Sequence, residues 1–71
     1  MTHLGVFFEK KSIKQSEVSR RTGISAARLS QLVNKDSTKL RATELYLIAL
    51  AVDISPADIF FQVCGHLKLD N

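Results

Sequence analysis

A single glycine, Gly23, separates two stretches whose apolar residues recur with a helical period rather than the alternation of a strand. Glycine enters the left-handed conformation that ends a helix without steric cost, so a helix that begins near Gln15 is expected to stop there. Ser25 can accept a hydrogen bond from a backbone N–H, which favours a second helix running to about Val33. Two short helices joined by a glycine turn can cross at a steep angle when a small residue lets them approach closely. The sequence therefore predicts a helix-turn-helix over about residues 15–33.

The same helical spacing predicts three further short helices. One surrounds Leu4, and another covers residues 42–52, where apolar residues recur at intervals of three and four. The last has the clearest start, with Ser55 as a cap and Pro56 in the first helical position. A chain of this length fits one small domain. We expect an all-α, compact bundle of five short helices over residues 1–71, with the last few residues frayed.

The basic residues gather in the middle of the chain. Residues 10–41 contain nine of the ten lysines and arginines and only two acidic residues, a net charge of +7, whereas residues 42–71 carry −3. A solvated surface usually mixes the two signs, so this separation favours a polyanion as partner. Charge alone does not decide whether the partner is nucleic acid or an acidic membrane surface.

Other classes of protein are not expected. The one cysteine, Cys64, allows no internal disulfide and suits a reducing compartment. No apolar run approaches the roughly 18 residues that span a membrane, and the first residues, MTHLGVFFEKK, have no basic region before an apolar stretch, as a signal peptide would. Cys64 and His66 are too few ligands for zinc, and no Ser/His/acid or Cys/His spacing supports catalysis. We expect a cytoplasmic protein without membrane association, metal, cofactor, small-molecule substrate or enzymatic activity.

The joint spacing of apolar, small and hydroxyl residues follows a known pattern. Its first half comprises Ile13, Gln15, Val18, Ser19, Gly23, Ile24, Ser25, Leu29 and Ser30, and its second half Leu45, Ile48, Ala49, Val52, Ile54, Ser55 and Ile59. In this spacing residues 13–60 resemble the lambda-repressor-like helix-turn-helix family, also called Cro-type or XRE. The resemblance implies a small bacterial or phage-type transcriptional regulator of the nucleoid, and a repressor in particular. It would bind duplex DNA sequence-specifically with its third helix in the major groove.

The resemblance and the outward positions of the third helix indicate which side chains contact DNA. Those expected to contact bases are Ala26, Ala27, Arg28, Ser30 and Gln31. Arg28 is the strongest candidate because a guanidinium can grip both acceptors of guanine, whereas the alanines can only touch a thymine methyl. Contacts to phosphates, which position the protein without recognising sequence, are expected from Lys14, Gln15, Ser25, Asn34, Lys35, Lys39 and Arg41.

The chain departs from the family at several positions. The family usually joins its first and third helices by an arginine–glutamate pair, and apolar Phe8 and Val33 stand there instead. We expect an apolar contact between them, which can replace an ion pair without loss of stability. The usual glycine after the third helix is Lys35, so Asn34 is expected to take the left-handed conformation. Arg41 stands where a serine normally caps the fourth helix.

The fourth helix is apolar nearly all round, which predicts burial on two sides. The residues expected to face a dimer or partner are Tyr46, Leu47, Leu50 and Phe61. A second copy would give a homodimer with its third helices about 34 Å apart on a roughly palindromic site. Alternatively, the C-terminal tail, with Leu67 and Leu69, covers the apolar face of the fourth helix. An alternative function also uses this face. The chain could be a protein-interaction module (antitoxin, antirepressor or partner-binding factor) that keeps the fold with weak or lost base recognition. The net charge of +7 on residues 10–41 argues against this alternative.

Overall fold

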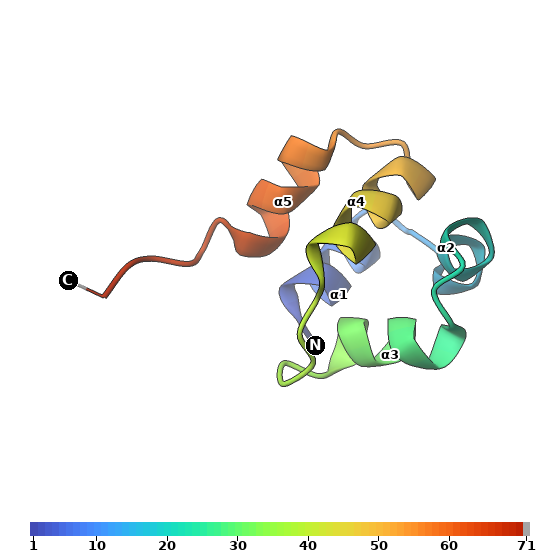
Figure 1. Ribbon diagram of the computed structural model, residues 1–71, viewed down its shortest axis with the longest axis horizontal. Helices are drawn as coiled ribbons and strands as arrows, with labels where there is room; N and C mark the ends of the chain where they lie inside the picture. Colours follow the sequence, from blue (N-terminus) through green and yellow to red (C-terminus); the bar gives the residue numbers. More distant parts are fainter. Residues whose placement is uncertain (71) are drawn as a thin grey trace.

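The computed structural model describes residues 1–70 and contains five α-helices in that range (Figure 1). They are α1 (His3–Lys10), α2 (Gln15–Thr22), α3 (Ala26–Asn34), α4 (Ala42–Ala51) and α5 (Pro56–Cys64). No strand occurs within the described range. The all-α bundle predicted from the helical spacing is confirmed, and α3 and α4 each end within a residue of the expected position.

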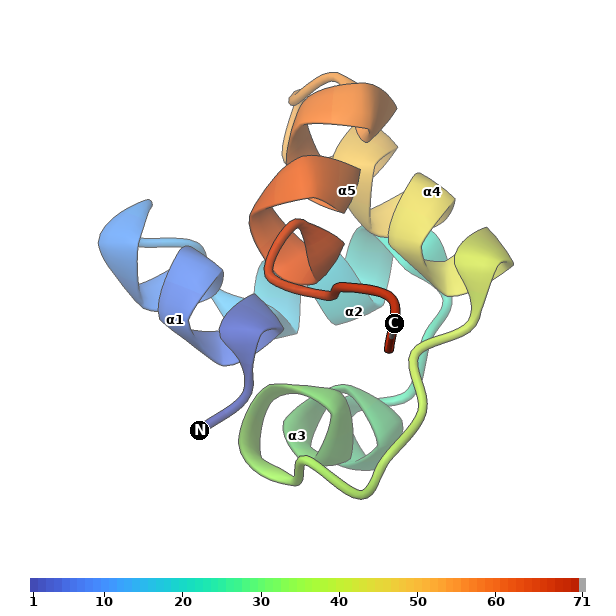
Figure 2. The same cartoon turned by 90° about the vertical axis from the view of Figure 1, so that its left-hand side faces the viewer.

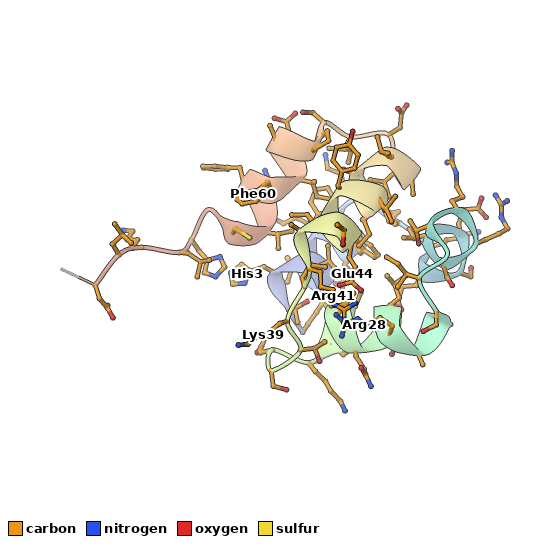
Figure 3. The ribbon with its side chains drawn as sticks, in the orientation of Figure 1. His3, Arg28, Lys39, Arg41, Glu44 and Phe60 are labelled. Atoms are coloured by element: carbon orange, nitrogen blue, oxygen red, sulfur yellow. The ribbon has the colours of Figure 1, made fainter. Side chains whose placement is uncertain are left out.

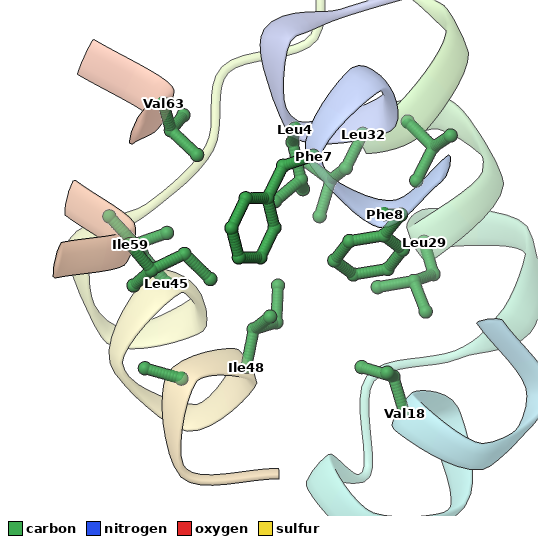
Figure 4. Close-up of a cluster of buried hydrophobic side chains, with 12 residues drawn as sticks. Leu4, Phe7, Phe8, Val18, Leu29, Leu32, Leu45, Ile48, Ile59 and Val63 are labelled. Carbon is green, nitrogen blue, oxygen red and sulfur yellow. The ribbon is translucent and has the colours of Figure 1, made fainter. Parts of the chain in front are cut away.

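Each helix contributes an apolar face to one shared core. The buried members of this core are Leu4, Phe7, Phe8, Val18, Leu29, Leu32, Val33, Leu45, Ile48, Ala49, Ile59 and Val63. Figure 4 shows Phe7 lying near Ile48 and Ile59, while Phe8 lies near Leu29. Phe8 and Val33 are both almost fully buried in this cluster, so the positions where the family has an ion pair belong here to the apolar core.

The corner between α2 and α3 has the predicted chemistry. Gly23 ends α2 with φ of 81°, in the left-handed region. The Ser19 hydroxyl donates to the carbonyl of Ile24 at 2.6 Å, which holds the turn against α2. Ser25 then caps α3, since its hydroxyl oxygen accepts the N–H of Arg28 at 3.1 Å. As a result α3 lies along one edge of the molecule in both views (Figures 1 and 2).

The far end of α3 is held by the N-terminus of the chain. The Thr2 hydroxyl donates to the Leu32 carbonyl at 2.7 Å, and the Thr2 N–H donates to the Val33 carbonyl at 2.9 Å. The same hydroxyl oxygen accepts the N–H of Gly5 at 3.0 Å and so caps α1. Thr2 therefore supplies partners for carbonyls that the end of α3 would otherwise leave unsatisfied.

The expectation for Asn34 was wrong. Asn34 is the last residue of α3, and its side-chain amide donates to the Ser30 carbonyl at 3.0 Å. Lys35 follows in an extended conformation, with φ of −111°. The residues other than glycine with positive φ in the described range are Ser12 and Asp53. No left-handed residue is needed here because the chain leaves α3 extended.

The C-terminal tail does not cover α4. Beyond α5 the chain extends away from the bundle (Figure 1). Leu67 and Leu69 are exposed, Leu69 to 90%. Of the two covers considered for the apolar face of α4, the tail is therefore excluded in this structure.

Candidate nucleic-acid interface

The outward face of α3 consists of short side chains. Exposed residues on it are Ala26, Ala27, Ser30, Gln31 and Asn34, while Leu29 and Leu32 point into the core. The Asn34 amide also approaches the Ser30 hydroxyl at 3.4 Å, so these two polar side chains form a pair one turn apart. A helix face of this kind can approach another surface closely, because little bulk projects from it.

Arg28 differs from its neighbours on α3 because its guanidinium already has partners. Its Nε donates to Glu44 Oε2 at 3.0 Å, and its Nη2 donates to Glu44 Oε1 at 2.9 Å. The Nη2 also donates to the carbonyl of Lys39 at 2.9 Å. The structure thus directs the strongest predicted base-contacting side chain toward α4 and the α3–α4 loop (Figure 3).

Glu44 was not identified from the sequence and is central to this arrangement. Besides Arg28, its Oε1 accepts the N–H of Arg41 at 2.9 Å, which caps the start of α4. The hydrogen bonds from Arg28 lower the pKa of Glu44 below its ordinary value, against the effect of burial, and the Arg41 N–H adds to the lowering. A glutamate three residues after a helix cap is a local signal for capping, but no local spacing indicates a partner in α3.

Most of the residues expected to contact phosphates lie in the loop after α3 and at the start of α2. Lys35, Lys39 and Arg41 are exposed in the loop from α3 to α4, and Lys14 is exposed at the start of α2. Gln15 is half-buried in the first turn of α2. Figure 3 shows Lys39 and Arg41 close to the Arg28–Glu44 pair. The loop that continues from the C-terminal end of α3 therefore carries exposed positive charge.

A comparison with protein families decides what this arrangement is. A family model described as "Cro/C1-type HTH DNA-binding domain" matches residues 3–61, which include α1 to α4 and the first two thirds of α5. This chain belongs to that family of helix-turn-helix DNA-binding domains. The resemblance to lambda-repressor-like proteins is thereby confirmed. No curated protein and no solved structure matches this Cro/C1-type domain significantly.

Two other arginines of the Cro/C1-type domain have partners within the protein. Arg20 forms an ion pair with Glu17 on the exposed side of α2. The Nη1 of Arg21 donates to the Ala51 carbonyl at 2.9 Å, at the C-terminal end of α4, where a cation is favourable. Part of the positive charge in residues 10–41 is therefore used to hold helices together.

The apolar face of α4 remains uncovered in the Cro/C1-type domain. Tyr46 is 54% exposed and Leu50 is 53% exposed, and Leu47 is exposed beside them. On α5, Phe60 and Phe61 are exposed as well. Single exposed apolar residues are common, but three large ones within two turns of α4 make this helix a candidate interaction surface.

Among residues 1–70, no group of three or more His, Cys, Asp or Glu side chains could hold a metal ion. The two histidines stack instead, with ring centroids 3.7 Å apart. None of the helices in this range is long and apolar enough to cross a membrane.

Proposed function

We propose that this Cro/C1-type domain is a transcriptional regulator, and a repressor in particular, that binds duplex DNA sequence-specifically with α3 in the major groove. The observation that supports this best is the exposed face of short side chains on α3, followed along the chain by the exposed cations Lys35, Lys39 and Arg41 of the α3–α4 loop. A major groove about 12 Å wide admits a helix whose outward side chains are small. The cations of this loop would meet the phosphates.

Roles can be assigned to the exposed side chains. We assign base contacts to Gln31 and Ser30, whose amide and hydroxyl can bond to base edges, and apolar contact with thymine methyl groups to Ala26 and Ala27. Arg28 is the exception on this face, since Glu44 and the Lys39 carbonyl occupy its donors. We assign phosphate contacts to Lys14, Gln15, Ser25, Asn34, Lys35, Lys39 and Arg41, which would set the register on the duplex.

The exposed apolar residues of α4 and α5 support a homodimer. Two copies joined through Tyr46, Leu47, Leu50 and Phe61 would shield these side chains from water, which is favourable by about 25 cal/mol for each Å² of apolar surface. A two-fold dimer would place its two α3 helices about 34 Å apart, on successive turns of a nearly palindromic site. A regulator of this kind works where the chromosome lies, which in a bacterial or phage-infected cell is the cytoplasm.

The test is a selection of binding sites from random DNA duplexes with the purified protein, at two salt concentrations. The expected result is enrichment of a roughly palindromic sequence, with an affinity that falls steeply as salt rises because counterions are released from phosphates. Failure to enrich any sequence at either salt concentration would contradict sequence-specific binding.

A second function is favoured by the same apolar surface together with the occupied Arg28. The domain would then be a protein-interaction module, such as an antitoxin, antirepressor or partner-binding factor, with weak base recognition. The selection separates the two functions: this module would show salt-dependent binding to any duplex, or none at all, and no enriched sequence.

A further inference from the structure

Arg28 lies in the first turn of α3 but points away from the exposed face of that helix. Three of its five N–H donors are engaged: the one on Nε and both on Nη2. Its side chain is 28% exposed and that of Glu44 is 11% exposed, so the pair is mostly shielded from water. The usual side-on grip of arginine on guanine uses N–H donors on two neighbouring nitrogens. Here Nε and Nη2 are engaged within the protein, and Nη1 is the one nitrogen of the guanidinium without such a partner.

The same pair fixes the loop that follows α3. Arg28 binds the carbonyl of Lys39, and Glu44, bound to Arg28, accepts the N–H of Arg41. Both ends of the segment 39–41 are therefore tied to α3 through one guanidinium and one carboxylate (Figure 3). This segment carries two of the cations assigned to phosphates.

The pair also gives α3 a polar connection to the bundle. Residues 1–70 contain two ion pairs, and the other lies within α2. At the positions where the family usually joins its first and third helices by charge, this chain has buried Phe8 and Val33. In the described part of the chain, the charged connection of α3 thus runs to α4 and not to α1.

We propose, given the DNA binding proposed for α3, that Arg28 is a positioning residue and does not contact bases. With Glu44 it clamps the α3–α4 loop, so that Lys39 and Arg41 are presented to phosphates at a fixed distance from α3. Base recognition is then left to Ser30, Gln31 and the two alanines. At no position of the preferred DNA site does a preference for guanine come from Arg28.

Substitution of Glu44 separates this role from simple electrostatics. Glu44→Gln removes a negative charge close to the DNA-binding face, so Coulomb attraction alone would strengthen binding to every duplex. Loss of the clamp has the opposite effect, because the loop cations would no longer be held in place. Glu17→Gln is the matched control, since it removes the same charge from an exposed arginine pair whose hydrogen bonds lie within α2.

The experiment measures affinity for the selected duplex and for all its single base-pair variants, at several salt concentrations. The proteins are the parent, Glu44→Gln, Arg28→Lys, Arg28→Met and Glu17→Gln, each confirmed to be folded at the temperature used. We expect Glu44→Gln and Arg28→Met to bind all duplexes about threefold to tenfold more weakly, with the slope of log K against log salt reduced by about one. The order of preferred bases stays the same. Arg28→Lys keeps the charge without the planar fork and should bind weakly too. Glu17→Gln binds as well as the parent or more tightly.

Two results would overturn the proposal. One is loss of preference at a single G·C pair in Arg28→Met, with that preference kept in Glu44→Gln, because Arg28 would then contact the base. The other is unchanged or tighter binding by Glu44→Gln with an unchanged salt slope. If the parent itself selects no duplex, the proposed DNA-binding function fails, and that failure is distinct from either result.

Discussion

Glu44 is the residue whose ionisation links the interface to the stability of the fold. Its carboxylate accepts hydrogen bonds from Arg28 and from the Arg41 N–H, which lower its pKa below the ordinary value of 4.5 although burial acts in the opposite direction. Since the pKa in the folded state lies below that in the unfolded state, the charged form favours folding. This contribution is fully present above the unfolded-state pKa and is lost as the pH falls through the folded-state pKa.

Glu44→Gln should therefore lower the free energy of unfolding at pH 7 by about 1 kcal/mol, through weaker hydrogen bonds to Arg28 and Arg41. The difference from the parent should shrink as the pH falls through the lowered folded-state pKa of Glu44, where the parent carboxylate also becomes neutral. Urea unfolding at pH 7 and at a series of lower pH values measures both effects. Glu17→Gln, at an exposed pair, should have a smaller effect at pH 7. A difference for Glu44→Gln that is the same at all pH values would contradict the assignment.

At the scale of residues, the sequence predicted which side chains of α3 face the core, but it placed Arg28 on the outward face, whereas the structure pairs Arg28 with Glu44. The inward positions of Leu29 and Leu32 follow from helical spacing, and the structure has both buried. The partner of Arg28 is 16 residues away along the chain. A contact of that kind depends on how α3 and α4 cross, and no local pattern encodes it. The same holds for Thr2, which bonds to carbonyls about 30 residues away.

At the scale of elements, the turn between α2 and α3 depends on the backbone of one residue. A Cβ placed on Gly23 would have nothing within 4 Å, so space does not require a glycine there. The backbone conformation, with φ of 81°, does require a glycine, because residues with a side chain adopt this conformation at a cost. The strain of a substitution at this position is therefore conformational alone.

Gly23→Ala should lower the free energy of unfolding by about 1 kcal/mol, while Gly23→Asn should cost less, since asparagine tolerates the left-handed conformation better than alanine. Thermal or urea unfolding of the two variants measures the difference. If the alanine variant were as stable as the parent, the left-handed turn would not be what ends α2. An asparagine variant less stable than the alanine variant would point to a side-chain clash instead.

Helix ends were predicted well where their signals are local. Gly23 and Ser25 act within a few residues of the ends that they define, and both do in the structure what the sequence indicates. Ser55 is the N-cap position of α5, although its side chain makes no capping hydrogen bond. The position where α3 ends was predicted to within a residue, but not how it ends, because its last carbonyls accept hydrogen bonds from Thr2, which is distant along the chain. The start of α4 is capped by Glu44 from within the helix, which compensates for an arginine at the cap position.

At the scale of the whole molecule, the packing of the five helices leaves large apolar side chains of α4 and α5 exposed to solvent. The sequence indicated that α4 has more apolar surface than one core can bury, because Leu47 and Leu50 fall outside its inward positions. It left the tail and a second copy as possible covers. The direction of the chain after α5 depends on the end of that helix and excludes the tail here. Of the two candidates for covering the apolar face of α4, a second copy of the chain remains.

The homodimer predicts the effect of placing charge on this face. The parent should sediment at twice the chain mass of 7.9 kDa, and a variant with Leu47→Glu and Leu50→Glu should sediment at the chain mass, because carboxylates cannot be buried unpaired in an apolar contact. Both side chains are already exposed within one chain, so the change should leave the fold of the monomer intact.

The matched control carries Leu67→Glu and Leu69→Glu, which add the same charge to exposed leucines of the tail. It should keep the mass of the parent, so any loss of DNA affinity that the two double variants share comes from added negative charge. A loss confined to the α4 variant, and greatest on a palindromic duplex, comes from the broken dimer, because a monomer holds only one half-site. A parent that sediments at the chain mass, or an α4 variant that keeps the parent's mass, would show that this face serves another partner.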